Sequence, residues 1–253
     1  MCALSAHSFG SDPKTARAVL DAALYTWDGA KRVGGAKPPA RTFVTVSRQP
    51  GANARSFAQR LTERLNSFPG GVWTAWDNEL LDKVSAEHGI EKRVIEAVEE
   101  QPNTWLDDFV QGFAASGAGH HVSEFGAYKR IAMTIRALAA AGHAVLVGRG
   151  AQFVTAGLPG GVHVRLIAPL EHRIKYFAKT YDLDHHQAAL RVAEAEHNRK
   201  VFYHRYWSGR EITAETFALT LNAGELSVDE LVECVLPLVR IRDGAASNAR
   251  KKE

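Results

Sequence analysis

A run of small, polar and basic residues, Ser47–Ser56, has the composition and spacing of a loop that binds phosphate. It follows the apolar segment Thr42–Val46 and precedes a segment with helical periodicity. Phosphate-binding loops have this layout because backbone N–H groups and the dipole at the start of the helix attract anions. The last eight residues follow the pattern G-x-x-x-x-G-K-[ST], except that Gln49, Ala54 and Arg55 replace the two glycines and the lysine.

The residues predicted to bind nucleotide phosphates are Gly51, Ala52, Asn53, Ala54, Arg55 and Ser56. The glycine and the alanines are small enough for backbone amides to approach an anion closely, and Asn53 tolerates a left-handed conformation. Arg55 can hold a phosphate through two parallel hydrogen bonds, and Ser56 can bind Mg²⁺ or one of its waters. The alternative is an ordinary strand–turn–helix junction with an exposed arginine.

Two further candidates come directly after predicted strands. Asp77 follows Val72–Trp76, and its carboxylate can accept hydrogen bonds from a sugar or the edge of a base. Arg149 follows His143–Val147 and lies between Gly148 and Gly150, which leave room for its side chain to reach a phosphate. The alternatives are a helix N-cap for the aspartate and a surface position on a turn for the arginine.

Basic residues alternate with aromatic residues in the segment 191–210. Phosphoryl transfer needs cations around the moving group, and Arg199 and Arg205 are the candidates for this role. Arg173, on the preceding helix, is a third candidate. The alternative is a solvated amphipathic helix whose aromatic side chains pack inward. Two histidine pairs, at 120–121 and 185–186, lack a third ligand at suitable spacing and do not predict a metal site.

Strands and helices alternate along the chain, which predicts an α/β fold: a parallel sheet with helices on both faces. The predicted strands are Thr42–Val46, Val72–Trp76, His143–Val147, Val162–Ile167 and Phe217–Leu221. The predicted helices are one that follows the loop and runs to about Asn66, Glu79–Glu87, Glu91–Glu100, Thr104–Phe113, Ser123–Ala141, one from Pro169, Asp184–Arg191, Glu194–Trp207 and Ser227–Leu238. Ligands of such sheets bind beyond the carboxyl ends of the strands, where the candidate residues fall.

Three regions are expected. Residues 1–40 form a helical N-terminal extension that ends in a Gly- and Pro-rich linker, packs on the main domain or a partner, and offers a surface for self-association. Residues 41–243 form the main domain, in which a connection rich in small residues spans 114–122. Residues 244–253 form a flexible tail.

Composition limits the classes of function. The chain has 253 residues and a formal net charge of only +3, which argues against a nucleic-acid partner. Its two cysteines, Cys2 and Cys234, do not form a disulfide framework, so a reducing compartment is expected. The first ten residues have no signal-peptide core, and the most apolar run, Ala137–Val147, is too short to span a membrane. A cytoplasmic protein is expected.

The chain contains, in this order, the blocks SRQPGANARSFAQRLTERL, AWDNELLDKVS, AVLVGRGAQFV, VRLIAPLEHRIKYFA and FALTLNAGELSVDELV. Over residues 42–240 this order resembles the cytidylate kinase-like family, which has the P-loop fold of nucleoside monophosphate kinases. The resemblance implies transfer of the γ-phosphoryl group of ATP to a nucleoside monophosphate such as CMP or dCMP, with Mg²⁺. Members similar to this chain often carry arginine at the loop position of Arg55.

The resemblance also implies roles for the candidates. Those on the acceptor side are Asp77, Arg149 and Arg173, and those near the moving group are Arg55, Arg199 and Arg205. Residues 184–210 resemble the mobile lid of monophosphate kinases, which excludes water. The strand before Gly148 is not followed by the aspartate that often organises Mg²⁺, so Ser56, the phosphates, water and Asp77 would hold the metal.

Two other hypotheses remain open. In one, the same fold serves as a regulatory module that binds nucleotides without catalysis, because Gln49 and Ala54 replace the loop glycines. In the other, the chain is a scaffold that assembles through its N-terminal helix. The sequence does not identify the acceptor.

Overall fold

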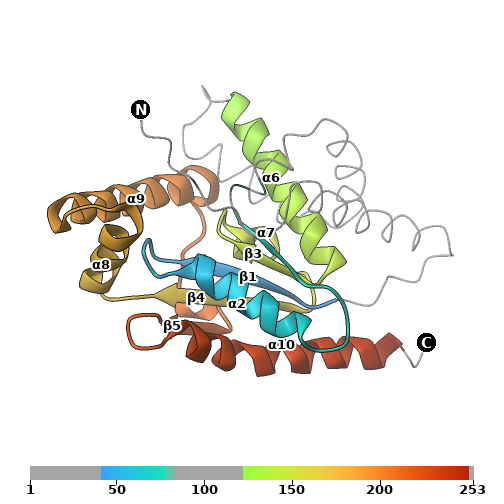
Figure 1. Ribbon diagram of the computed structural model, residues 1–253. Helices are drawn as coiled ribbons and strands as arrows, with labels where there is room; N and C mark the ends of the chain where they lie inside the picture. Colours follow the sequence, from blue (N-terminus) through green and yellow to red (C-terminus); the bar gives the residue numbers. More distant parts are fainter. Residues whose placement is uncertain (1–40, 78, 80, 82–121, 251–253) are drawn as a thin grey trace.

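The computed structural model describes residues 41–77, 79, 81 and 122–250. A five-stranded sheet lies at its centre (Figure 1), with strands β1 (Phe43–Arg48), β2 (Thr74–Trp76), β3 (Ala144–Val147), β4 (Gly161–Ile167) and β5 (Leu219–Asn222). The order across the sheet is β2-β3-β1-β4-β5, and every neighbouring pair is parallel. The predicted α/β fold is confirmed, and each predicted strand is present with ends shifted by no more than two residues.

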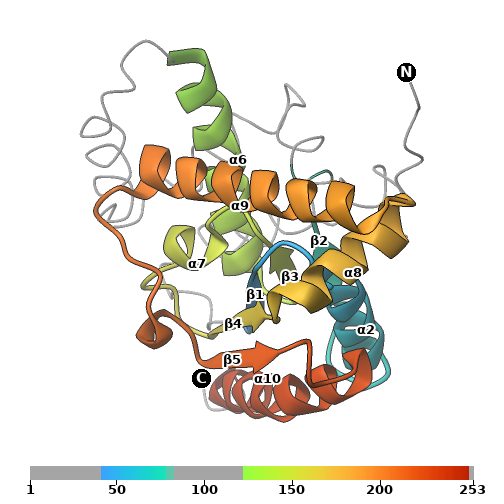
Figure 2. The same ribbon diagram turned by 90° about the vertical axis from the view of Figure 1, so that its left-hand side faces the viewer.

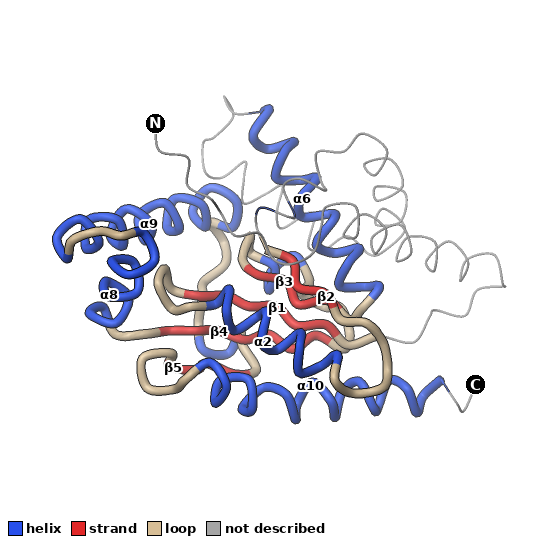
Figure 3. The backbone as a smooth tube through the Cα atoms, in the orientation of Figure 1, coloured by secondary structure: helices blue, strands red, loops and turns tan. Residues whose placement is uncertain are grey.

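Helices cover both faces of the sheet (Figure 3). The described helices are α2 (Ala54–Asn66), α6 (Val122–Ala141), α7 (Ala151–Val154), α8 (Leu170–Tyr181), α9 (His185–Trp207), α10 (Val228–Arg250) and the 3-10 helix η1 (Ala214–Thr216). Helices α2 and α10 pack on one face, whereas α6, α7 and the end of α9 pack on the other. The two helical layers thus cover both faces of the sheet.

Alternation along β1 builds the two cores. Val44 and Val46 point toward α2 and α10, whereas Phe43 packs in the core formed with α6. All three side chains are buried. Successive side chains of a strand point to opposite faces of the sheet. Because helices cover both faces of this sheet, β1 carries apolar side chains on both of its faces.

A partly buried polar pair joins β1 to β4. The Oγ1 atom of Thr45 lies 2.8 Å from Nδ1 of His163, and the imidazole packs edge-on against Phe43. Burial lowers the pKa of His163 to about 4, and the charge of Arg242 acts in the same direction. The histidine is therefore neutral in the folded protein at neutral pH, whereas in the unfolded chain it titrates near 6.5.

Folding stability is expected to fall when the pH drops below about 6.5. The unfolded chain then binds a proton at His163 that the folded protein does not bind until about pH 4. Between pH 7.5 and pH 5 the loss is about 2 kcal/mol. Urea unfolding at the two pH values measures it, and His163→Gln should remove this part of the loss. An equal pH dependence in both proteins would contradict the assignment.

Helix α9 is one continuous helix, so the prediction of separate helices at Asp184–Arg191 and Glu194–Trp207 was wrong. It begins with a capping box in which the Asp184 side chain accepts from the N–H of Gln187. The intervening residues include no helix breaker, and Val192 is buried against α8. Helices α8 and α9 thus form a hairpin with its own small core.

Helix α10 continues to Arg250, beyond the predicted end at Leu238 and through most of the range expected to be a flexible tail. Contacts beyond the predicted end hold it against the sheet. Arg242 donates to the carbonyl oxygen of Gly161, and Asp243 lies 3.1 Å from Nε2 of His143.

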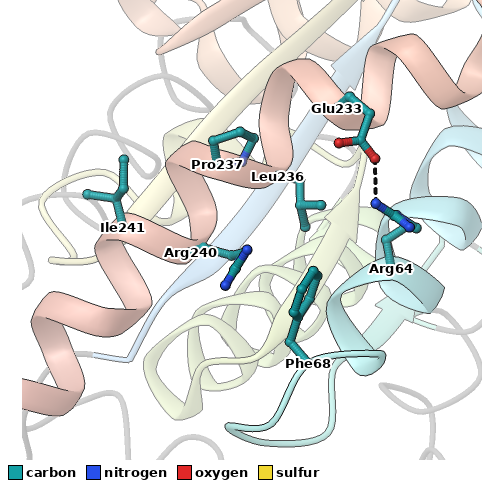
Figure 4. A pocket seen from close by; sticks show the side chains of 7 residues that line it. All are labelled: Arg64, Phe68, Glu233, Leu236, Pro237, Arg240 and Ile241. Carbon is teal, nitrogen blue, oxygen red and sulfur yellow. Dashed lines mark hydrogen bonds and ion pairs between the residues drawn. The ribbon is translucent and has the colours of Figure 1, made fainter.

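The far end of α2 packs against α10 around a small surface pocket (Figure 4). Arg64 donates to Glu233 at 2.7 Å, and the Arg240 guanidinium lies 4.0 Å from the centroid of the Phe68 ring. Leu236 adds apolar contact between the helices. This packing anchors the helix whose other end carries the loop.

Several predictions lie outside the described residues: the N-terminal extension 1–40 with its self-association surface, the helices at Glu91–Glu100 and Thr104–Phe113, and most of Glu79–Glu87 and of the connection 114–122. None of the described helices is long and apolar enough to cross a membrane.

Candidate functional site

The loop between β1 and α2 has the backbone shape that an anion cradle requires. Gly51 and Asn53 have left-handed φ values of 84° and 50°, and the N–H of Ala52 donates to the carbonyl oxygen of Gln49 at 3.1 Å. Asn53 occupies the N-cap of α2 but makes no side-chain capping hydrogen bond. The Asn53 side chain thus does not cap the first amides of α2, which leaves them available to an anion, as the sequence pattern predicts.

Gly51 also lies directly against α8. A Cβ atom at this position would lie 2.8 Å from Cβ and 2.9 Å from Cα of Arg173. The close approach is possible only without a side chain. The loop and the base of the helical hairpin are thus in van der Waals contact.

Gln49 has a structural role at the position of the first loop glycine. Its N–H donates to the carbonyl oxygen of Leu166, and its side-chain oxygen accepts from the N–H of Ala168 at 2.9 Å. Both partners belong to the end of β4 and the segment that enters α8. The glutamine therefore joins the loop to the hairpin base, a role that glycine cannot fill.

Arg55 connects the loop to the end of β2. Its Nη2 atom donates to Oδ2 of Asp77 at 2.8 Å, and the aspartate is buried. The carbonyl oxygen of Asp77 also accepts from the N–H of Leu81, as at the start of a helical turn. The predicted loop cation and the predicted strand-end carboxylate therefore occupy one site.

Three more arginines converge on this site. Arg48 ends β1, Arg149 follows β3, and Arg199 projects from α9, where it donates to Oγ of Ser47 at 2.8 Å and lies 5.1 Å from the centroid of the Tyr203 ring. The pKa of Arg48 is lowered to about 10, mainly by burial and also by the charges of Arg199 and Arg149, against the opposing effects of Tyr203 and Asp77. Burial likewise lowers the pKa of Arg199.

The turn that carries Arg149 is held by two aromatic side chains. Arg149 has a φ of 54°, and its carbonyl oxygen accepts from the hydroxyl of Tyr128 at 2.6 Å. The indole of Trp207 in turn donates to this hydroxyl at 3.1 Å. A Cβ atom at Gly150 would lie 2.9 Å from the indole nitrogen, so the glycine permits this packing.

These side chains surround a cleft of about 940 Å³ between the loop and the α8–α9 hairpin. Figure 2 faces the carboxyl ends of the strands and shows α9 crossing above them. The described residues that line the cleft include Arg48, Gln49, Gly51, Ala52, Asn53, Ala54, Arg55, Asp77, Glu79, Arg149, Tyr176, Phe177, Thr180, Tyr181, Arg199, Phe202 and Tyr203. Four arginines face two carboxylates, which leaves an excess of positive charge.

The structure brings most of the predicted site residues together, but it places three of them elsewhere. Ser56 lies in the first turn of α2, outside the described lining. Arg173 is buried, and its guanidinium donates to the carbonyl oxygen of Ala168 and, at 2.6 Å, to Glu196. Arg205 lines a smaller neighbouring hollow together with Arg149. Their direct contacts with ligands remain predictions.

Arg48 is the site residue that the sequence analysis missed. It is the last residue of β1 and directly precedes the loop, so its position at a strand end was the available signal. Among the residues the structure describes, no group of three or more His, Cys, Asp or Glu is arranged to hold a metal ion.

Comparisons with known proteins agree with this geometry. The chain is similar to an uncharacterized protein from Eubacterium ventriosum ATCC 27560, with 18% identity and a TM-score of 0.61 over 79% of this chain and 98% of the other. At that identity the likeness concerns the fold. No match was found among curated proteins. The sequence profile of the cytidylate kinase-like family matches residues 43–225. With a match over most of its length, the chain belongs to the cytidylate kinase-like family.

Proposed function

We propose that the protein is a phosphotransferase that moves the γ-phosphoryl group of ATP to a nucleoside monophosphate, with CMP or dCMP as the expected acceptor. The main support is the charge of the cleft, where four arginines surround a loop whose backbone already has the shape of an anion cradle. Burial, together with the charges of Arg199 and Arg149, lowers the pKa of Arg48, so an anion bound beside Arg48 would stabilise its charged form. A polyphosphate supplies that anion.

In the proposed reaction, an oxygen of the acceptor phosphate forms a bond to the γ-phosphorus while the bond to the β-phosphate oxygen breaks, and ADP leaves. The loop amides and Arg55 hold the donor phosphates. Arg149, beyond the end of β3, binds the acceptor phosphate, and Arg199 contacts the moving group between them. Such transfers depend mainly on positioning and on charge stabilisation, which these residues supply.

Mg²⁺ fits this cleft as a partner of the phosphates. Asp77 and Glu79 provide carboxylate oxygens in the lining, and Mg²⁺ needs only one or two protein ligands beside phosphate and water. The metal would neutralise charge on the phosphates. Asp77 is buried whereas Glu79 is half-buried, so Glu79 is the more exposed of the two carboxylates. Ser56 remains a predicted ligand through an intervening water.

The α8–α9 hairpin serves as the lid in this proposal. Arg173 joins the entry to α8, the loop and α9 through Ala168, Gly51 and Glu196. We therefore assign it a positioning role in place of the direct substrate contact expected from the sequence. Arg205, beside Arg149 in the neighbouring hollow, is assigned to the acceptor side.

The second candidate function is a regulatory module that binds nucleotides without turnover. It is favoured by one feature of the site: Gly148 follows β3 where an acidic residue would organise the metal. In that case calorimetry would detect ATP or monophosphate binding without product formation.

A coupled assay of ADP release tests the proposed function. It should show turnover that depends on Mg-ATP and on an added acceptor, with CMP, dCMP and UMP compared at equal concentration. Absence of acceptor-dependent turnover in folded protein that binds ATP would support the regulatory alternative. Absence of both would exclude a nucleotide function at this cleft.

Arg55→Ala is expected to weaken ATP binding or slow transfer by roughly 2–4 kcal/mol, since Arg55 carries the charge at the start of α2 and contacts the phosphates. Calorimetry and steady-state kinetics measure the two effects separately.

The matched control is Arg60→Ala on the same helix. Arg60 is exposed and pairs with Asp229 and Glu63 on the surface, so its loss should change stability and binding only slightly. If both variants behaved alike, Arg55 would have no special role in the cleft.

A further inference from the structure

We infer that the aromatic face of α8, centred on Tyr181 and Tyr176, binds the base of the nucleotide whose phosphates lie on the loop. The inference rests on the nucleotide-binding part of the proposed function and extends it to a base-stacking wall. Both tyrosines line the cleft.

The position of α8 relative to the loop supports this assignment. The main chain of Arg173 lies against Gly51, so α8 begins in contact with the phosphate cradle. Residues three, four, seven and eight positions further along share one side of a helix. From Arg173 these are Tyr176, Phe177, Thr180 and Tyr181, and all four line the cleft. The last of them lies about 12 Å along the helix axis from Arg173.

The packing of these rings distinguishes ligand contact from core formation. Phe177 packs on the small core of the hairpin, which explains its presence, but Tyr176 and Tyr181 belong to none of the three hydrophobic clusters of the described residues. Tyr181 is 45% exposed. The centroid of its ring lies 5.3 Å from that of the Phe177 ring, and the centroid of the Tyr176 ring lies 6.4 Å from that of Phe177, so Phe177 neighbours both tyrosine rings.

The chemistry of the cleft matches a ligand with two unlike ends. Arginines gather near the carboxyl ends of the strands, whereas tyrosine rings line α8 beyond the loop. An inorganic polyphosphate would use only the first part. A nucleoside triphosphate uses both, since every base has a face that stacks on an aromatic ring.

Calorimetric titration of the full chain with ATP and, separately, with inorganic tripolyphosphate tests the inference. Tyr181→Ala should weaken ATP binding about tenfold or more and leave tripolyphosphate binding unchanged, because only ATP carries a base. Tyr176→Ala should act in the same direction. Tyr181→Phe keeps the ring and should bind both ligands like the wild type, which controls for folding.

The outcomes separate two kinds of failure. If the wild type binds both ligands and Tyr181→Ala and Tyr176→Ala weaken both equally or neither, the base does not lie on α8, and the proposed function still stands. If the wild type binds neither ligand, the phosphate cradle and the base wall both fail.

Discussion

Replacement of Arg199 by methionine is expected to slow acceptor-dependent ADP release by about 10³-fold or more. Arg199 lines the cleft and donates to Ser47 near the end of β1, and in the proposed reaction it contacts the moving phosphoryl group. A cation that contacts the moving phosphoryl group stabilises charge that develops in the transition state, so its loss should lower kcat more than it changes KM.

Methionine preserves much of the side-chain stem that packs near Tyr203. Removing a half-buried guanidinium whose pKa is lowered by burial also removes a desolvation cost, so the melting temperature should not fall greatly. Lys200→Met, at the exposed neighbouring position, is the matched control and should retain activity. A loss of thermal stability as large as the loss of turnover would instead indicate that Arg199 serves to pack α9.

Gly51→Ala is expected to be the most damaging single change in the loop. Alanine at a φ of 84° is strained by about 1–2 kcal/mol, and its Cβ atom would overlap the backbone of Arg173. Overpacking of this kind adds about 1–3 kcal/mol. The loop must shift away from α8 to accept the methyl group, so nucleotide binding should be lost together with part of the stability.

Gly157→Ala separates the two contributions. Gly157 has a similar φ of 76°, but nothing lies within 4 Å of the position its Cβ atom would take. This variant should show the backbone strain alone and bind nucleotides normally. Urea unfolding and calorimetry on both variants measure the difference. If both variants were destabilised equally and still bound nucleotides, the contact between the loop and α8 would not contribute to binding.

Local sequence patterns predicted the sheet well because both of its faces are covered. Buried strands such as β3 read as short apolar runs, and the turn after each one ends in polar residues. The position of the cleft could be predicted in the same way, since Asp77 and Arg149 follow the carboxyl ends of β2 and β3 and Arg55 lies in the first turn of the helix after β1. For these residues, position in the chain nearly determined position in space.

Contacts between distant segments could not be predicted in this way. In the sequence, Gln49 is a departure from the loop pattern. In the structure, its side-chain oxygen accepts a hydrogen bond from the N–H of Ala168, which is 119 residues away. Arg173 is predicted to bind substrate, and the structure adds that its guanidinium joins Ala168 to Glu196. In both cases the hydrogen-bond partner lies on another element of the fold. The spacing of residues within one segment therefore could not predict the contact.

The continuity of α9 has a consequence for where the protein opens. Its 23 residues span about 35 Å from a hairpin with three fully packed core residues to Trp207 in the main core. Local unfolding begins where the fewest apolar contacts are broken. The end beside α8 is therefore expected to release first, while the end that supports Arg149 stays folded. Under the proposed function, nucleotide exchange is then expected at the α8 end of the cleft, with Arg149 kept in place.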